Sequence, residues 1–302
     1  MQFRKIAQLT GHNAAIFSIV EGMDEHQILS GAGDGWVALW NLDDPETGRL
    51  AANVGTQIFS LCFLKKENRL VVGNMNGGVH WVDLERPEAT KNIAHHQKGT
   101  YDVRYIGDSV FTVGGDGKIT RWSVEESRSM ETFHLSNQAL RSLDFCEKRK
   151  EIAVGSSDGA IYFLNADTLD LRFVLRNAHQ NSVFCVQYSP IGSYLLSGGR
   201  DAHLNAWDLD NHYMKISSQP AHWFTINAIA FHPEGHLFAT GSRDKTIKIW
   251  DARNLELVKV LEGPRDGGHF NSVNKVFWSK HQNTLISASD DRTLILWNSP
   301  TQ

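Results

Sequence analysis

The amino-acid sequence predicts an all-β protein made of seven four-stranded antiparallel units, and three observations lead there. A motif that runs from an aspartate to a tryptophan six positions later occurs five times, with two degenerate copies completing the series. Apolar residues fall into short runs separated by turn residues, as is typical of strands. No stretch of ten or more residues keeps a helical period.

The repeat spacing sets the number of units. The last residues of the seven copies stand at positions 40, 82, 122, 164, 207, 250 and 297, which are 40 to 47 residues apart. A fixed period in this range is the signature of a repeat architecture. We therefore expect one domain, residues 1–302, made of seven consecutive repeats.

Each repeat holds four short apolar runs, and the sixth shows them at 228–231, 237–240, 246–250 and 257–261. Residues 3–9 precede the first repeat as a fourth run precedes the others, while nothing after Trp297 is long enough for another strand. The sequence thus predicts that the N-terminal strand completes the seventh unit.

Four polar side chains recur in five repeats and can form a hydrogen-bonded relay. The indole N–H of tryptophan only donates, a hydroxyl can accept from it and donate to imidazole, and the other imidazole N–H can donate to a carboxylate. The sets are His12, Ser30, Asp34 and Trp40; His96, Thr112, Asp116 and Trp122; His179, Ser197, Asp201 and Trp207; His222, Thr240, Asp244 and Trp250; and His269, Ser287, Asp291 and Trp297.

Repeats 2 and 4 lack this relay. The aligned positions hold Val54, Val72, Asn76 and Val82 in one, and Ser136, Val154, Asp158 and Leu164 in the other. Because a buried half-relay costs free energy, joint loss of its inner members supports the alignment.

Catalytic and metal-binding interpretations of these histidines fit less well. Nucleophilic catalysis needs an exposed hydroxyl beside an oxyanion site, whereas these hydroxyls stand in mid-strand among apolar residues. His95 and His96 have no third ligand nearby in the sequence, and His96 belongs to a relay. We expect no catalytic residue, no metal and no cofactor.

The chain resembles the WD-repeat β-propellers over its whole length. Trp-Asp dipeptides stand at 207–208 and 250–251, and Gly-His dipeptides at 11–12 and 268–269. The resemblance implies a seven-bladed β-propeller closed by the N-terminal strand, and a non-enzymatic scaffold that binds proteins or peptides.

The resemblance also implies that certain positions in each repeat face the mouth of a central channel. We expect an aromatic arc to face an arginine arc there, and a partner with apolar and acidic or phosphorylated side chains to bind between them. Alternatively, the aromatics plug the channel and the arginines pair with Asp290. The candidate residues are Phe17, Phe59, Met75, Tyr101, Arg141, Phe184, Arg200, Asn227, Arg243, Asn274 and Asp290. A Gly-rich insertion, 262–268, is expected to overhang the same mouth.

Composition narrows the function classes. A formal charge of -4 offers no broad positive field, so nucleic acid is not an expected partner, and no apolar run is long enough for a membrane span. The first 13 residues lack the apolar core of a signal peptide. The three cysteines are expected to be buried thiols, and they are Cys62, Cys146 and Cys185. The expectation is a cytoplasmic monomer. A propeller enzyme, a small-molecule binder and a structural subunit that uses its blade edges remain the alternatives.

Overall fold

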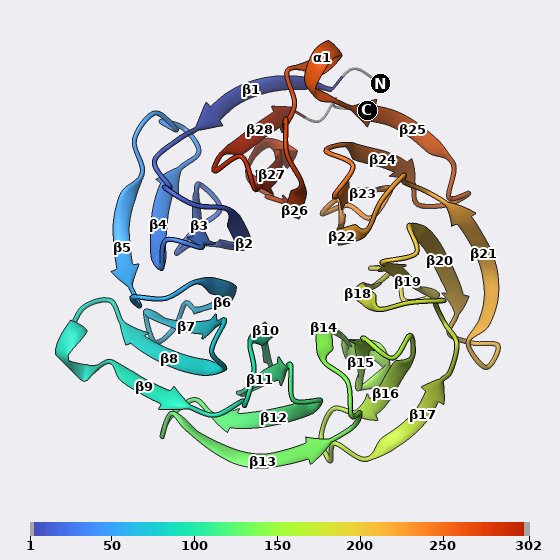
Figure 1. Cartoon of the computed structure of the whole chain (residues 1–302), viewed down its shortest axis with the longest axis horizontal. Coiled ribbons are helices and arrows are strands. Elements are labelled where there is room, and N and C mark those ends of the chain that lie inside the picture. The colour runs from blue at the N-terminus through green and yellow to red at the C-terminus, as the bar shows by residue number, and fades with distance from the viewer. Residues whose placement is uncertain (1–2, 299–302) are drawn as a thin grey trace. The chain divides into compact units, whose positions relative to one another are not determined.

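The computed structural model describes residues 3–298 and contains seven four-stranded antiparallel sheets (Figure 1). This confirms the predicted seven-bladed β-propeller, and each sheet is one blade. The chain divides into two units, which we name the terminal unit, residues 1–58 and 222–302, and the central unit, residues 59–221.

The terminal unit contains three blades. One runs in the order β2 (Ile16–Glu21), β3 (Gln27–Ala32), β4 (Trp36–Asn41) and β5 (Arg49–Asn53). Another has β22 (Ile226–Phe231), β23 (Leu237–Ser242), β24 (Ile247–Asp251) and β25 (Leu257–Leu261). The third has β26 (Val273–Trp278), β27 (Leu285–Ser289), β28 (Leu294–Asn298) and β1 (Arg4–Leu9), with a 3-10 turn at His281–Asn283.

The central unit contains four blades. Their strands are β6 (Ile58–Leu64), β7 (Arg69–Asn74), β8 (Gly78–Asp83) and β9 (Lys91–Ala94); β10 (Thr100–Ile106), β11 (Ser109–Gly114), β12 (Lys118–Ser123) and β13 (Arg128–His134); β14 (Leu140–Cys146), β15 (Glu151–Ser156), β16 (Ile161–Asn165) and β17 (Leu171–Leu175); and β18 (Val183–Tyr188), β19 (Tyr194–Gly199), β20 (His203–Asp208) and β21 (Met214–Pro220). Short 3-10 turns stand at Pro87–Ala89 and Glu147–Arg149.

The N-terminal strand completes the last blade, as predicted. β1 pairs antiparallel with β28, with Lys5 opposite Trp297 and Leu9 opposite Leu294. Phe3 and Leu9 are buried, so the strand contributes apolar surface to the core as well as hydrogen bonds to the sheet.

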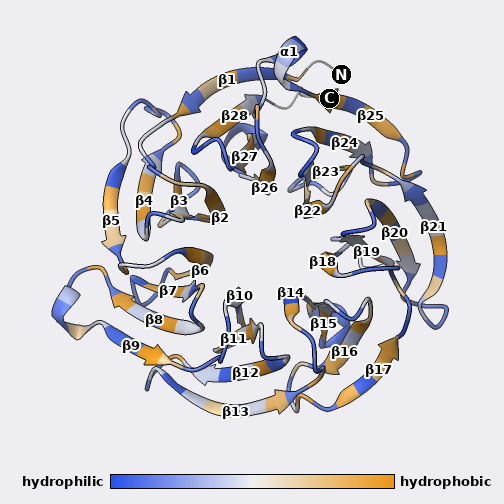
Figure 2. Ribbon diagram, in the orientation of Figure 1, coloured by the Kyte–Doolittle hydropathy of each residue, from blue (hydrophilic) through white to orange (hydrophobic). Residues whose placement is uncertain are grey.

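The hydrophobic core lies between neighbouring blades. Phe3, Ile249 and Trp278 belong to one cluster in the terminal unit, while Ile119 and Leu143 belong to another in the central unit. Second strands such as β11, β15 and β19 are buried throughout, whereas the edge strand β13 is largely exposed. Figure 2 shows that hydrophobic and hydrophilic residues alternate along edge strands such as β17. Burial on both faces explains why the second strands read as continuous apolar runs.

One turn glycine is fixed by a close backbone approach. Gly117, between β11 and β12, has a φ of +75°, and a Cβ built there would lie 1.6 Å from the carbonyl oxygen of Ser136. Gly107, between β10 and β11, also has a positive φ, yet nothing lies within 4 Å of a Cβ built there. Only the first position therefore requires glycine for space.

The expectation for the 262–268 insertion was wrong. Residues Gly263–Asp266 form a one-turn helix, α1, that lies beside the edge strands β1 and β25 in Figure 1 rather than over the inner strands β22 and β26. The Lys259 ammonium donates to the Asp266 carboxylate at 2.8 Å, and the Lys5 ammonium donates to the Gly267 carbonyl at 2.9 Å. The segment is thus tied to the edge of its unit. Across residues 3–298, no helix has the length and apolar character that a membrane-spanning helix requires.

Candidate functional site

The structure assembles the relay in five blades. In the first, the Trp40 indole donates to the Ser30 hydroxyl at 2.8 Å, that hydroxyl lies 2.8 Å from His12 Nε2, and His12 Nδ1 lies 3.0 Å from Asp34. The hydroxyl accepts from tryptophan and so donates its own hydrogen to Nε2, which leaves Nδ1–H to donate to the carboxylate. The corresponding distances in all five blades fall between 2.8 and 3.0 Å.

Burial disfavours the charged form of the relay histidine in two blades, and it lowers the pKa of His96. It also lowers the pKa of His222, although the Asp244 carboxylate opposes this effect. Burial alone would raise the pKa of Asp244, but the hydrogen bond from His222, with further donors from Thr246 and Trp223, holds it well below its usual range. The carboxylate is therefore ionised at neutral pH.

Each relay aspartate also holds the loop in front of its blade. Asp34 accepts from the backbone N–H of Asn13 at 2.9 Å and from that of Trp36 at 3.0 Å. Asp244 accepts from the backbone N–H of Trp223 at 3.0 Å. The residue after each relay histidine is thus fixed through its backbone, whatever its side chain.

The second blade lacks the relay, as predicted, but it has a polar network of its own. Asn76 occupies the aligned turn position but is exposed, and Asn74 takes its part. Asn74 Oδ1 accepts from the backbone N–H groups of Asn76 and Gly78, and Asn74 Nδ2 lies 2.7 Å from His80 Nε2. Among residues 3–298 the buried Trp81 indole N–H has no hydrogen-bond partner, while the Arg69 guanidinium lies 5.5 Å from the centre of its ring system.

The fourth blade replaces histidine with tyrosine. Asp158 accepts from the Ser136 hydroxyl at 2.6 Å and from the Tyr162 hydroxyl at 2.7 Å. It also accepts from the backbone N–H of Ala160 at 2.9 Å. The aspartate is therefore fully engaged in this blade although the relay is missing.

Four candidate binding residues of the central unit form one continuous stack. Phe59, Tyr101, Arg141 and Phe184 come from β6, β10, β14 and β18, the first strands of consecutive blades. The Phe59 and Tyr101 rings stack with centres 5.4 Å apart and planes 25° apart. The Arg141 guanidinium carbon lies 4.4 Å from the Tyr101 ring centre and 5.2 Å from that of Phe184. We call these four residues the aromatic–arginine stack.

Arg141 is held on both sides within this stack. It lies between two aromatic rings, and its Nε donates to the Ser157 hydroxyl at 2.8 Å. Cation–π contacts on both faces hold the guanidinium in one orientation. Its two Nη atoms have no hydrogen-bond or ion-pair partner among residues 3–298.

Two further candidates of the central unit are exposed. Met75 is 45% exposed, and the Arg200 side chain is exposed with no ion-pair partner within the described part of the chain. The backbone N–H of Arg200 donates to the Ser182 carbonyl at 2.9 Å, which fixes the turn that carries it.

In the terminal unit most candidate residues bind within the fold. Asn274 Nδ2 donates to Asp290 at 2.7 Å and to the Ile16 carbonyl at 3.1 Å, and Asn227 Nδ2 donates to the Val273 carbonyl at 2.9 Å. Asp290 is thus paired with an amide and not with an arginine. Phe17 is half-buried, and Arg243 is exposed.

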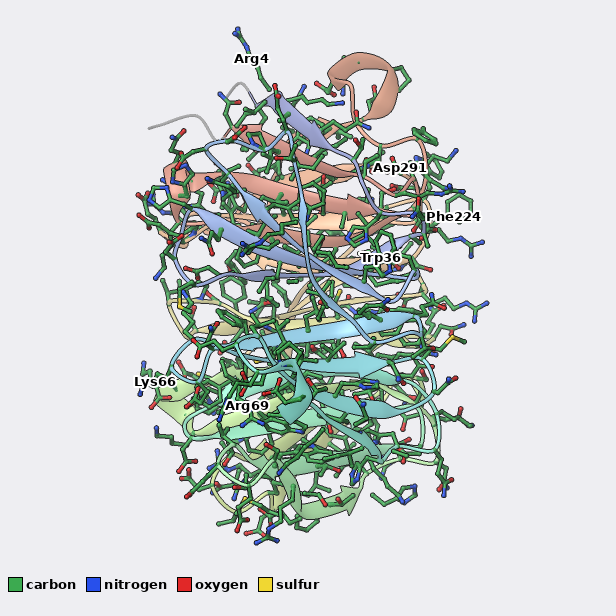
Figure 3. The ribbon with its side chains drawn as sticks, turned by 90° about the vertical axis from the view of Figure 1, so that its left-hand side faces the viewer. Arg4, Trp36, Lys66, Arg69, Phe224 and Asp291 are labelled. Carbon is green, nitrogen blue, oxygen red and sulfur yellow. The ribbon has the colours of Figure 1, made fainter. Side chains whose placement is uncertain are left out.

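The sequence analysis missed three exposed aromatic residues. Trp223, Phe224 and Phe270 are 87%, 58% and 68% exposed, and they directly follow the relay residues His222 and His269. Figure 3 shows Phe224 on the same side of the terminal unit as the relay residue Asp291 and Trp36. The available signal was the run Trp223-Phe224 at positions where other repeats have Asn13, Gln97 or Gln180.

Possible metal ligands lie away from His95 and His96, the two adjacent histidines that were considered and rejected as a metal pair. His95 Nε2 lies 2.8 Å from the Thr120 hydroxyl and His96 Nε2 lies 2.9 Å from Thr112, so both rings are engaged in hydrogen bonds. Burial lowers the pKa of His95 to about 4. Among the described residues, two other groups bring three ligand atoms together, namely His26, Asp43 and His281, and His232, Glu234 and His236.

All three cysteines are buried and free, as expected. Burial raises the pKa of Cys62 to about 12, so its thiol is protonated at neutral pH. A reactive thiolate at this position is therefore absent.

Comparison with known proteins places this geometry in context. The chain is 26% identical to cilia- and flagella-associated protein 43 of Xenopus laevis over 184 residues, 24% identical to protein groucho of Drosophila melanogaster over 190, and 25% identical to WD repeat-containing protein 1 of Gallus gallus over 215. These matches cover 58%, 61% and 68% of this chain. They span only 10%, 25% and 35% of the relatives' own lengths.

A solved structure shows the same fold over the whole chain. The WD40 β-propeller domain of Doa1 superposes with a TM-score of 0.86 at 18% identity, covering 99% of this chain and 98% of that one. The model of the WD domain, G-beta repeat, matches residues 3–41, 171–208, 214–251 and 256–298, just over half of the sequence. The chain therefore belongs to the WD40 family of WD-domain, G-beta repeat proteins.

Proposed function

We propose that this chain is a non-enzymatic scaffold that binds a peptide or protein segment with apolar and acidic or phosphorylated side chains. The aromatic–arginine stack, together with the exposed candidates Met75 and Arg200 of the same unit, is the proposed contact surface of the central unit. The observation that carries the proposal is the orientation of Arg141, whose guanidinium is held between Tyr101 and Phe184 with its Nη atoms unpaired in the described structure.

The physical case rests on preorganisation. An arginine fork that is already fixed between two rings loses little side-chain entropy when it pairs with a carboxylate or phosphate. The half-buried rings of Phe59 and Tyr101 offer apolar area beside that charge. Aromatic residues and arginine are the side chains that most often dominate binding energy at protein interfaces.

The exposed aromatics of the terminal unit support a second contact area for the same class of partner. Trp223, Phe224 and Phe270 project from loops whose backbones are fixed by relay aspartates. Arg243 is exposed in the same unit, and it provides a positive charge for an acidic segment.

The test is a selection from a displayed peptide library followed by affinity measurement. We expect wild-type protein to enrich peptides that combine acidic or phosphorylated residues with apolar ones, and Arg141→Ala to weaken the selected peptides at least about tenfold. Phe59→Ala should weaken them by roughly 2 kcal/mol. Arg253→Ala is the matched control, because it removes an exposed arginine from a turn outside the proposed surfaces.

Salt dependence separates the charged contact from the apolar one. Affinity should fall between low and physiological ionic strength, and the double variant Arg141→Ala/Arg200→Ala should flatten that fall. Selected peptides that ignore both arginines, with a hydrogen-exchange footprint on strands such as β13 or β17, would instead indicate binding at blade edges.

A further inference from the structure

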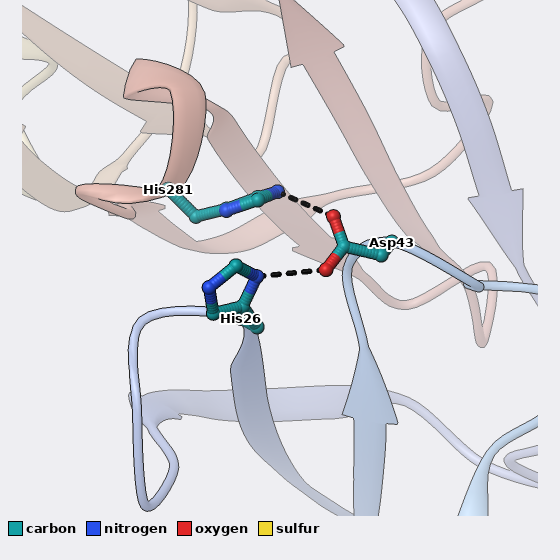
Figure 4. Close-up of side chains that lie close together, drawn as sticks. All are labelled: His26, Asp43 and His281. Carbon is teal, nitrogen blue, oxygen red and sulfur yellow. Dashed lines mark hydrogen bonds and ion pairs between the residues drawn. The ribbon is translucent and has the colours of Figure 1, made fainter.

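Three potential metal ligands meet in the terminal unit, at the loops between β2 and β3, after β4, and between β26 and β27. They are His26, Asp43 and His281, which come from two blades and from sequence positions more than 200 residues apart. Figure 4 shows the carboxylate of Asp43 between the two imidazole rings. Neither the proposed peptide surface nor the relay uses any of these residues.

The distances are already close to those of a coordination shell. His26 Nδ1 lies 2.7 Å from Asp43 Oδ2, and His281 Nε2 lies 3.0 Å from Asp43 Oδ1. All three ligand atoms lie within 4.8 Å of one another. Ligand atoms at a tetrahedral Zn²⁺ with bonds of about 2.0–2.1 Å are about 3.3 Å apart, so small side-chain rotations suffice to admit a cation.

The backbones that carry the three ligands are held in place. The Leu42 N–H donates to the His26 carbonyl at 2.7 Å, which ties the two loops of the first blade together next to Asp43. The His281 N–H donates to the Ser279 hydroxyl at 3.1 Å, and that hydroxyl donates to the Glu25 carbonyl at 3.2 Å across the two blades. The loops therefore pay little ordering entropy on binding a cation.

Solvent can reach the cluster on one side. The side chains of His26 and Asp43 are 48% and 50% exposed, while that of His281 is 10% exposed. A cation can thus enter from solvent, and a water molecule can fill the coordination position that the protein leaves open. The other group is closed differently, because His232 is buried and its Nδ1 accepts from the backbone N–H of Glu234 at 3.1 Å.

We propose that His26, Asp43 and His281 form a binding site for a divalent transition-metal ion of the zinc type. Two imidazoles and one carboxylate, with a fourth position left to water, are an established three-residue ligand set for Zn²⁺. Their nitrogen and oxygen donors do not suit Ca²⁺ or Mg²⁺, which prefer an all-oxygen shell. The bound cation replaces the protons that the two rings share with Asp43.

Such a site joins two blades of the terminal unit. His26 and Asp43 belong to the blade of β2–β5, whereas His281 belongs to the blade that β1 completes. Because the unfolded chain does not hold these ligands together, a cation that binds here stabilises the folded state.

The test titrates metal-free full-length protein with ZnCl₂ in a calorimeter, and with CoCl₂ while visible absorption is recorded. Wild-type protein should bind one Zn²⁺ at this site, and its melting temperature should rise with Zn²⁺ concentration. His26→Ala and His281→Ala should each weaken this binding at least about 100-fold, because changes to residues that only orient ligands already cost roughly 10 to 100-fold. The Co²⁺ absorption should disappear in both.

His236→Ala is the matched control, since it removes one imidazole from the other histidine group and should leave the affinity unchanged. The half-exposed His26 is not part of the core, so the melting temperature of metal-free His26→Ala should match that of the wild type and show that the variant folds. The proposal is overturned if wild-type protein binds no Zn²⁺, if both ligand variants bind as the wild type does, or if His236→Ala alone abolishes binding. In each of those cases His26, Asp43 and His281 form only a hydrogen-bonded surface network.

Discussion

Replacing Asp244 with alanine tests whether the relay contributes to stability. Asp244 accepts four hydrogen bonds, from His222 Nδ1 at 2.8 Å, from the backbone N–H of Trp223 at 3.0 Å, and from the backbone N–H and hydroxyl of Thr246 at 3.0 and 2.6 Å. The His222 side chain is 0% exposed, so without the carboxylate its Nδ1–H has only the Thr246 hydroxyl, 3.2 Å away, as an acceptor.

The expected cost follows from these contacts. An unsatisfied buried donor costs about 1–3 kcal/mol, and two backbone donors near the surface that must turn to water cost about 0.5–1 kcal/mol each. Asp244→Ala should therefore lower the free energy of unfolding by roughly 2–5 kcal/mol. For a chain of 302 residues, with an unfolding entropy of about 2.1 cal/mol/K per residue, we expect the melting temperature to fall by about 3–8 °C.

The control lies in the same blade. Within the described part of the chain, the Asp251 carboxylate accepts only from the backbone N–H groups of Arg253 and Asn254, at 2.8 and 3.3 Å in an exposed turn. Asp251→Ala should therefore cost less than about 1 kcal/mol. Differential scanning calorimetry of both variants at pH 7.5 measures the difference. Equal melting temperatures for the two variants would refute the relay as a source of stability.

Three further predictions concern other parts of the fold. Burial raises the pKa of Asp144 from 3.8 to about 6, so the stability linked to its protonated form is full below pH 3.8 and is lost as the pH rises through 6. Between pH 4 and 7.5, the free energy of unfolding of Asp144→Asn should therefore rise by roughly 1–3 kcal/mol relative to that of the wild type. Parallel curves of melting temperature against pH for the two proteins would contradict this. Gly117→Ala should cost more than about 3 kcal/mol because its Cβ meets a carbonyl oxygen, whereas Gly107→Ala should cost only about 1 kcal/mol, and urea unfolding of both measures the gap. Deleting the first nine residues should expose the edge of β28 and remove the buried side chain of Leu9. We expect the melting temperature to fall strongly and light scattering to show self-association. A monomer with an unchanged melting temperature would exclude the proposed role of β1.

The fold could be predicted from the sequence because each relay position accepts only a few residue types, so the repeat is easy to recognise. A tryptophan six positions after an aspartate marks the same strand in five blades. In the structure, each of these tryptophans lies on one strand of a four-stranded sheet. The pairing of β1 with β28 followed from the same reasoning, since residues 3–9 stood where a fourth strand belongs.

The departures from prediction arise where side-chain conformation decides. Asn74 was overlooked because the aligned position is that of Asn76. The Asn74 side chain, two residues earlier, accepts from the backbone N–H groups of Asn76 and Gly78. The contact of Arg141 with the Tyr101 and Phe184 rings was not predicted, because spacing gives the strand and not the direction of a long side chain.

The His26, Asp43 and His281 cluster could not be found from spacing at all. Its members stand in loops that the repeat does not constrain, and two of them are neighbours only because blades at opposite ends of the chain lie next to each other within the terminal unit. A search for short metal motifs depends on ligands that are close in sequence, and 255 positions separate His26 from His281.

Because the relay aspartates hold the loop backbone, folding of the blade and the choice of the loop side chain can be designed separately. The position after each relay histidine is fixed through its N–H, so a designer can exchange its side chain without disturbing the blade. These five positions already carry asparagine, glutamine, glutamine, tryptophan and phenylalanine. They are therefore natural sites for a randomised library, in which new binding specificities can be selected on a framework whose folding does not depend on the residues being varied.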